Sequence, residues 1–180
     1  MNRLISIAVL TAGCAGGGAP VANEATLSPV LGRAEAVLMD SAGRQVGVAT
    51  FVERDEGVSI GVSVTGLPAG THGFHIHERG ACEAPTFESA GDHFDPEGRQ
   101  HGTEAEGGPH AGDLENLVVG GHGTGRMSGH SEGVTLGEGD NSLLQGDGTA
   151  LVIHADPDDY RTQPSGNSGA RIACGVIRRR

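Results

Sequence analysis

The sequence contains no lysine, and aromatic residues make up only 3% of its 180 residues. All twelve basic residues are arginines, and 23 acidic residues outnumber them, which gives a formal net charge of −11. A chain without a basic stripe cannot neutralise the phosphates of a nucleic acid, so nucleic acid is excluded as a partner.

Helix-favouring segments are also scarce, because 32 glycines are spread along the chain and each costs a helix interior about 1 kcal/mol. An apolar content of 36% is still enough for a buried core, which excludes a disordered acidic chain. The length fits one well-buried domain, which we place at residues 31–180.

Residues 1–14 have the pattern of an export signal. Arg3 supplies the positive charge, and residues 4–12 form an apolar run that is too short to span a bilayer. The end of this segment, Leu-Thr-Ala-Gly-Cys, is similar to a bacterial lipoprotein signal in which Cys14 becomes acylated. We therefore expect export and a membrane-anchored lipoprotein facing the periplasm or cell exterior, with residues 15–30 as a flexible tether. Ordinary cleavage, leaving a soluble protein in that compartment, is the alternative.

Period-two alternation of apolar and polar residues is the main secondary-structure signal. Residues 58–64 carry valine or isoleucine at every second position, with glycine or serine between them, which predicts a half-buried strand. Further strands are predicted at residues 33–40, 45–54, 73–77, 114–120, 125–131, 149–154 and 170–177. About eight short strands separated by turn signals favour an all-β fold, an antiparallel sandwich or barrel.

Two long segments, 78–113 and 155–169, interrupt this rhythm. Loops of such length in a compact domain are usually functional. The notable polar residues of the chain lie in these segments or directly beside them.

Histidine is the most unusual feature, with nine residues. Alternation along 73–77 places His75 and His77 on one face of a strand, from which two imidazoles can hold a metal ion. The other candidate ligands are His93, His101, His110, Asp113 and His154. Imidazole suits copper and zinc, and a carboxylate added to histidines suits tetrahedral zinc. Spacing alone does not divide these residues between metals, and it equally allows a storage or sensing site.

The remaining three histidines have simpler interpretations. His72 shares its strand face with the apolar Phe74 and Ile76, which predicts a structural, hydrogen-bonded histidine. We expect His122 and His130 to be surface residues.

Five motifs in order now give the chain a family resemblance. They are Gly-Phe-His-Ile-His-Glu (73–78), Gly-Asp-His-Phe-Asp-Pro (91–96), His-Ala-Gly-Asp-Leu (110–114), Leu-Val-Ile-His (151–154) and Gly-Ala-Arg-Ile-Ala-Cys-Gly-Val-Ile (169–177). Over about residues 33–177 the chain resembles the copper/zinc superoxide dismutase family, in its bacterial exported type. The resemblance implies an eight-stranded antiparallel Greek-key barrel with two long functional loops.

The resemblance also implies two metal sites. Copper would be bound by His75, His77, His93 and His154, and zinc by His93, His101, His110 and Asp113. His93 would bridge the two metals. Asp158 would link His75 to His101 through hydrogen bonds to their outer ring nitrogens. Within the turn 156–159 we expect Asp156 and Asp159 to be solvated.

The family's disulfide corresponds to Cys82 and Cys174, and its active-site arginine to Arg171, which would receive the superoxide anion. The implied reaction is dismutation of superoxide to oxygen and hydrogen peroxide, with His93 taking up and returning a proton. The alternative is a copper- or zinc-binding module of the same fold without turnover. The chain ends Val-Ile-Arg-Arg-Arg, where the animal enzymes have an apolar dimer edge, so we do not expect that dimer.

Overall fold

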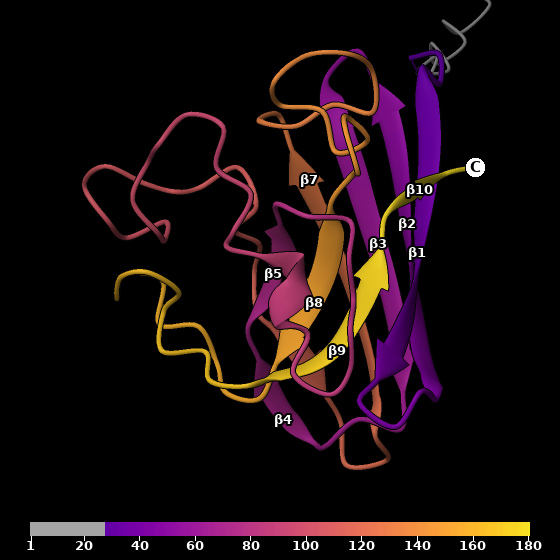
Figure 1. The fold of residues 1–180 in the computed structure, drawn as a ribbon, viewed down its shortest axis with the longest axis vertical. Helices are drawn as coiled ribbons and strands as arrows, with labels where there is room; N and C mark the ends of the chain where they lie inside the picture. The colour runs from indigo at the N-terminus through magenta and orange to yellow at the C-terminus, as the bar shows by residue number, and fades with distance from the viewer. Residues whose placement is uncertain (1–27) are drawn as a thin grey trace, which may run out of the picture.

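The computed structural model describes residues 28–180 as ten strands (Figure 1). They are β1 (Gly32–Asp40), β2 (Gln45–Arg54), β3 (Gly57–Thr65), β4 (Gly70–His72), β5 (Phe74–His77), β6 (Leu117–Val119), β7 (Thr124–Ser131), β8 (Ala150–His154), β9 (Arg171–Val176) and β10 (Arg178–Arg179). Within these residues the single helical element is a short 3-10 turn, Glu88–Ala90, so the all-β prediction is confirmed. The predicted signal segment and Cys14 lie outside the described residues.

The strands form one antiparallel sheet in the order β4-β6-β7-β3-β2-β1-β9-β8-β5, with β10 paired to β1. β4 and β5 stand at opposite ends of this order, yet only Gly73 separates them in the chain. The two ends of the sheet therefore meet, and the sheet curves into a nearly closed barrel (Figure 1).

The core fills the inside of this barrel. On β3, Val58, Ile60, Val62 and Val64 are buried, as their alternation predicts. β5 is buried on both faces, because Phe74 and Ile76 belong to the core cluster while its two histidines face the other way, beneath the long loops. The strand that carries two predicted metal ligands is therefore also fixed by the core.

Both predicted long loops lie on the same side of the barrel, next to β5 and β8 (Figure 1). A third long connection, residues 132–149 between β7 and β8, was not predicted. Its buried Val134, Leu136 and Leu143 pack into the main core, so this connection has a structural role.

Cys82 and Cys174 form a disulfide across 92 residues of sequence, with their Cα atoms 5.7 Å apart. It joins the first long loop to β9, above a small buried cluster that includes Phe87 and Val152. Closing a loop of this length stabilises the fold by roughly 4–5 kcal/mol in the chain-entropy treatment. No helix in residues 28–180 is long and apolar enough to cross a membrane.

Candidate metal centre

Three of the predicted copper ligands stand on two paired strands. β5 runs antiparallel to β8, with His75 opposite Val152 and His77 opposite Ala150, and His154 ends β8. The Nε2 atoms of His77 and His154 lie 3.4 Å apart. With His93 from the first long loop, these residues form a buried group whose potential ligand atoms all lie within 4.8 Å of one another.

The ring nitrogens that face away from this group are all hydrogen-bonded. The contacts are His75 Nε2 to Asp158 Oδ2 (2.8 Å), His77 Nδ1 to the carbonyl of Gly91 (2.9 Å) and His154 Nδ1 to the carbonyl of Gly169 (3.2 Å). A carbonyl oxygen only accepts, so Nδ1 of His77 and of His154 carries the proton and Nε2 keeps a free lone pair. The tautomers therefore present the nitrogens that a metal ion needs.

The predicted zinc ligands gather around one carboxylate oxygen. Asp113 Oδ1 lies 2.8 Å from Nδ1 of His93, 3.0 Å from Nδ1 of His101 and 3.3 Å from Nδ1 of His110. Two ligand atoms of a tetrahedral metal site lie roughly 3.3 Å apart when each is about 2.0–2.1 Å from the metal. The observed separations approach this value. The other oxygen, Oδ2, accepts backbone N–H bonds from Gly102 (2.8 Å) and His110 (3.0 Å), which fixes the orientation of the carboxylate.

A second possible grouping joins His75, rather than His110, to His93, His101 and Asp113. His75 contacts Asp158 through Nε2, so only its Nδ1 is free, whereas His110 Nδ1 lies 3.3 Å from Asp113 Oδ1 and has no hydrogen bond. The contact between His110 and Asp113 fits the predicted zinc set, and His75 fits the group that also holds His77 and His154.

Three buried side-chain nitrogens in the described part of the chain have no hydrogen-bond partner: His75 Nδ1, His93 Nε2 and His110 Nδ1. Buried polar atoms are almost always paired, so three unpaired imidazole nitrogens in one cluster call for another partner. All three belong to the predicted ligand set. The potential ligand atoms thus fit copper and zinc. Nδ1 of His93 lies in the zinc group, and Nε2 of His93 lies in the copper group.

Burial controls the charge of the copper-side histidines. Desolvation, with smaller contributions from neighbouring histidines and from the charge of Arg171, lowers the pKa of His77 to about 2 and that of His154 to about 3. Desolvation also outweighs the hydrogen bond to Asp113 and lowers the pKa of His93 to about 4. These imidazoles are neutral at physiological pH, which is the form that binds a metal.

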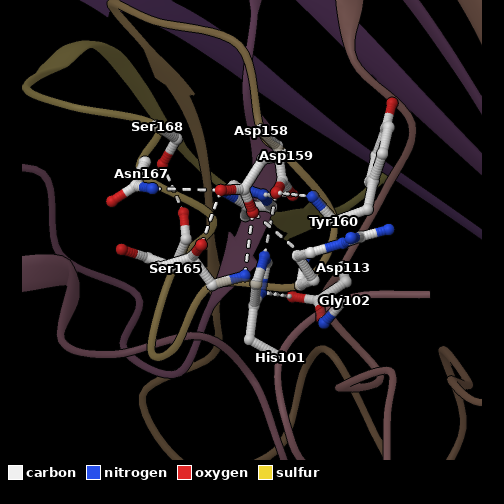
Figure 2. A network of polar contacts seen from close by, with 12 residues as sticks. His101, Gly102, Asp113, Asp158, Asp159, Tyr160, Ser165, Asn167 and Ser168 are labelled. Carbon is white, nitrogen blue, oxygen red and sulfur yellow. Dashed lines mark hydrogen bonds and ion pairs between the residues drawn. The ribbon is translucent and has the colours of Figure 1, made fainter. Parts of the chain in front are cut away.

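On the zinc side, the pKa of one histidine is raised instead of lowered. Burial lowers the pKa of His101, but its hydrogen bonds to Asp113 and Asp158 outweigh burial and raise it to about 9. His101 Nε2 lies 3.0 Å from Asp158 Oδ1 (Figure 2), while Asp158 Oδ2 lies 2.8 Å from His75 Nε2. Asp158 therefore joins one residue of each metal group, as the resemblance implied.

Arg171 is held beside the copper group by two backbone carbonyls. Its Nη1 donates to Phe87 and its Nη2 to Gly91, both at 2.7 Å. The Gly91 carbonyl also accepts the hydrogen bond of His77, so one peptide group positions both the arginine and a candidate ligand.

The structure adds polar residues that the sequence did not indicate. Asn116 binds the backbone of Asp158 at both ends, accepting its N–H (2.9 Å) and donating to its carbonyl (2.8 Å). The N–H of Asn116 donates to the Tyr160 hydroxyl at 2.9 Å. No periodicity marks these residues, because their partners lie more than forty positions away in the chain.

Asp159 is exposed, as predicted for a solvated turn. It also accepts hydrogen bonds within its own loop from Arg161, Thr162 and Asn167, the last of which is labelled in Figure 2. This carboxylate shapes the second long loop.

The predictions for the other histidines are confirmed. His72 is buried, with Nδ1 2.8 Å from the carbonyl of His154 and Nε2 3.0 Å from that of Pro68. His122 and His130 are exposed and belong to neither metal group.

A group of four imidazoles and an adjacent group of imidazoles around one carboxylate share His93 on a disulfide-linked β-barrel, and this arrangement defines the class of the protein as a binuclear metalloprotein. A model of the family described as copper/zinc superoxide dismutase (SODC) matches residues 45–177. A protein named superoxide dismutase [Cu-Zn] 2, from Aquifex aeolicus, is 48% identical over 148 residues, covering 81% of this chain and 86% of that protein. The chain belongs to the copper/zinc superoxide dismutase family.

Bacillus subtilis provides a second relative, called superoxide dismutase-like protein YojM, which is 44% identical over 78% of this chain and 73% of its own length. The crystal structure of a SOD-like protein from the same species superposes with a TM-score of 0.76 at 42% identity, covering 79% of this chain and 96% of that one.

Proposed function

We propose that the protein is a copper/zinc superoxide dismutase. Two superoxide anions and two protons give one molecule of oxygen and one of hydrogen peroxide. The supporting observation is the convergence of six histidines and one aspartate into two groups that share His93, with three buried imidazole nitrogens left without a protein partner.

Copper would be held by His75, His77, His93 and His154, and zinc by His93, His101, His110 and Asp113. When bound, copper supplies one-electron redox chemistry, and zinc supplies a fixed positive charge without redox chemistry.

Arg171 supplies the charge that binds the anion. Its guanidinium is fixed by two carbonyls, so its orientation does not depend on the substrate. A fixed cation beside the reacting position attracts and orients an anion without reorganisation during the reaction.

His93 can hold a proton at a useful place. Its Nδ1 faces Asp113, while its Nε2 is buried and has no protein partner. A proton held on Nε2 would lie inside the copper group and can pass to the reduced substrate, which makes His93 the general acid.

Product stoichiometry and metal content test this function together. Purified protein should contain one copper and one zinc per chain and should release one oxygen and one hydrogen peroxide for every two superoxide anions. A chain with both metals in place that consumes superoxide no faster than buffer would instead be a binding module of the same fold.

We further propose that the protein is exported and anchored through acylated Cys14, with residues 15–30 as the tether. The signal pattern of residues 1–14 supports this, and a disulfide suits an oxidising compartment. Intact-mass analysis of the exported protein should find a chain that begins at Cys14 with an added acyl mass. An unmodified chain that starts well beyond Cys14 would contradict the anchor alone.

At the other end of the chain, β10 carries the exposed Arg178 and Arg179. These charges argue against an apolar subunit interface of the animal type at this edge.

A further inference from the structure

The backbone of His101 is held by one side chain from the other long loop. The His101 N–H donates to Gln163 Oε1 at 2.9 Å, and Gln163 Nε2 donates to the His101 carbonyl at 2.9 Å. The two residues are 62 positions apart in the chain. The amide pairs with His101 as a neighbouring strand would, through one donor and one acceptor.

The orientation of this amide is fully determined. Gln163 Nε2 uses its second hydrogen on the carbonyl of Arg161, at 3.1 Å. Reversing the amide would place its oxygen against two carbonyl oxygens and its NH2 group against an N–H. Gln163 therefore binds its own loop and His101 at the same time.

His101 is otherwise held through its ring, by Asp113 on one side and Asp158 on the other. The residue is fully buried, so a lost backbone partner is not readily replaced by solvent. Movement of this backbone would shift Nδ1 away from the other members of the zinc group.

Three further contacts mark the same junction between the loops. The N–H of Glu104 donates to the Tyr160 carbonyl, Arg161 forms an ion pair with Glu104, and Gly102 packs so closely on Tyr160 that a side chain there would collide with its carbonyl. Among the second-loop residues of this junction, Gln163 is the one whose side chain contacts a candidate metal ligand.

We propose that Gln163 is a positioning residue that holds the backbone of His101 and so determines how long the zinc position retains its metal. This role rests on the zinc site of the proposed function.

Zinc release from the metal-loaded full chain to a colorimetric chelator tests this role. Gln163→Ala should release zinc about tenfold faster, at the low end of the effect of residues that orient metal ligands. Gln163→Glu keeps the acceptor but loses both donors, and should also release zinc faster. Gln100→Ala is the matched control, because it removes the same side chain beside His101 without breaking a hydrogen bond to the second loop, and it should release zinc as the wild type does.

A spectroscopic measurement separates positioning from general stability. With cobalt(II) in the zinc position, the visible absorption spectrum should change in Gln163→Ala and stay unchanged in Gln100→Ala. Wild-type zinc release from Gln163→Ala would overturn the role, as would faster release that merely follows a lower melting temperature of the metal-free protein with an unchanged cobalt spectrum. A wild-type chain that binds no zinc at all would instead contradict the proposed function.

Discussion

The two halves of the metal centre are built in different ways. The copper side stands on the paired strands β5 and β8, where burial keeps the histidines neutral and backbone carbonyls set their tautomers. The zinc side is assembled from the first long loop around the carboxylate of Asp113, which raises the pKa of His101 instead. The barrel strands therefore fix three of the four candidate copper ligands, whereas the zinc group depends on contacts within and between the loops.

The largest expected effect comes from breaking the copper side alone. His154→Ala removes a strand-borne candidate ligand that belongs to the copper group alone, so dismutase activity should fall by more than about 100-fold, since even residues that only orient ligands cost 10–100-fold. Metal analysis and a superoxide assay on the same sample check this, with His122→Ala as an exposed histidine control. Normal activity in His154→Ala would make the copper assignment wrong.

The zinc side should respond mainly in stability. Asp113→Ala removes the oxygen on which three imidazoles converge, so zinc should be lost while a slower copper reaction survives. Bound zinc stabilises the folded chain by about 4 kcal/mol, and losing this stabilisation should lower the melting temperature by roughly 10 °C for a domain of this size. Calorimetry with metal analysis measures this, and the exposed Asp140→Ala should melt as the wild type does. Full zinc content in Asp113→Ala would contradict the assignment.

A smaller effect is expected from Arg171, which lies beside the copper group without belonging to it. At about 5–6 Å from a bound anion, its charge contributes about 3 kcal/mol at an effective dielectric constant near 20, and under about 1 kcal/mol in water. Arg171→Ile should therefore slow the reaction roughly tenfold, and Arg171→Glu more, with unchanged metal content. Pulse radiolysis provides the rates, and Arg126→Ile, an exposed change on β7, should leave them unaltered.

The salt dependence of the wild-type rate refines this prediction. A net charge of −11 repels superoxide at long range, and salt screens charges beyond about 8–10 Å. Added salt should therefore slow this protein less than it slows an enzyme with a lysine-rich channel rim. A rate for Arg171→Glu that equals the wild-type rate would remove Arg171 from the mechanism.

A separate prediction concerns how the stability of the metal-free protein depends on pH. His77, His93 and His154 have lowered pKa values in the fold, so the unfolded chain binds more protons below about pH 6.5 and the free energy of unfolding falls in acid. His101 has a raised pKa of about 9, so its contribution is complete below about pH 6.5 and is lost as the pH rises through 9. Stability should peak near pH 6.5 and fall more steeply on the acid side.

Urea unfolding of the metal-free protein at pH 5, 6.5 and 9 measures this profile. Loading zinc should abolish the alkaline decline, because the metal then takes the place of the proton on His101. A metal-free protein whose stability keeps rising from pH 6.5 to 9 would contradict the electrostatic difference between the two sides.

The sequence predicted the parts of the molecule in which local pattern and structure agree. Alternation identified β3 and placed His75 and His77 on one face, because side chains alternate along any strand. The predicted residues 45–54 coincide with β2. The ligand set followed from motif resemblance, and the structure brings those residues together in two groups.

The parts that could not be predicted depend on contacts between distant segments. Asn116 and Gln163 are ordinary loop amides whose partners lie 42 and 62 residues away, so no local pattern marks them. The connection 132–149 was missed because its alternation stops after Val134 and Leu136, and mostly glycine and polar residues follow. The exposure of Asp159 was predicted, but its hydrogen bonds within the loop were not, since composition alone does not reveal which backbone groups a carboxylate contacts.

The dependence of the superoxide removal rate on bound copper tests the central claim most directly. Protein already loaded with zinc should be titrated with copper, with the rate measured by pulse radiolysis at each step. The rate should rise in proportion to bound copper and stop rising at one copper per chain, because one preformed group of four histidines carries the reaction. A rate that stays at the buffer value when one copper per chain is bound would contradict the account.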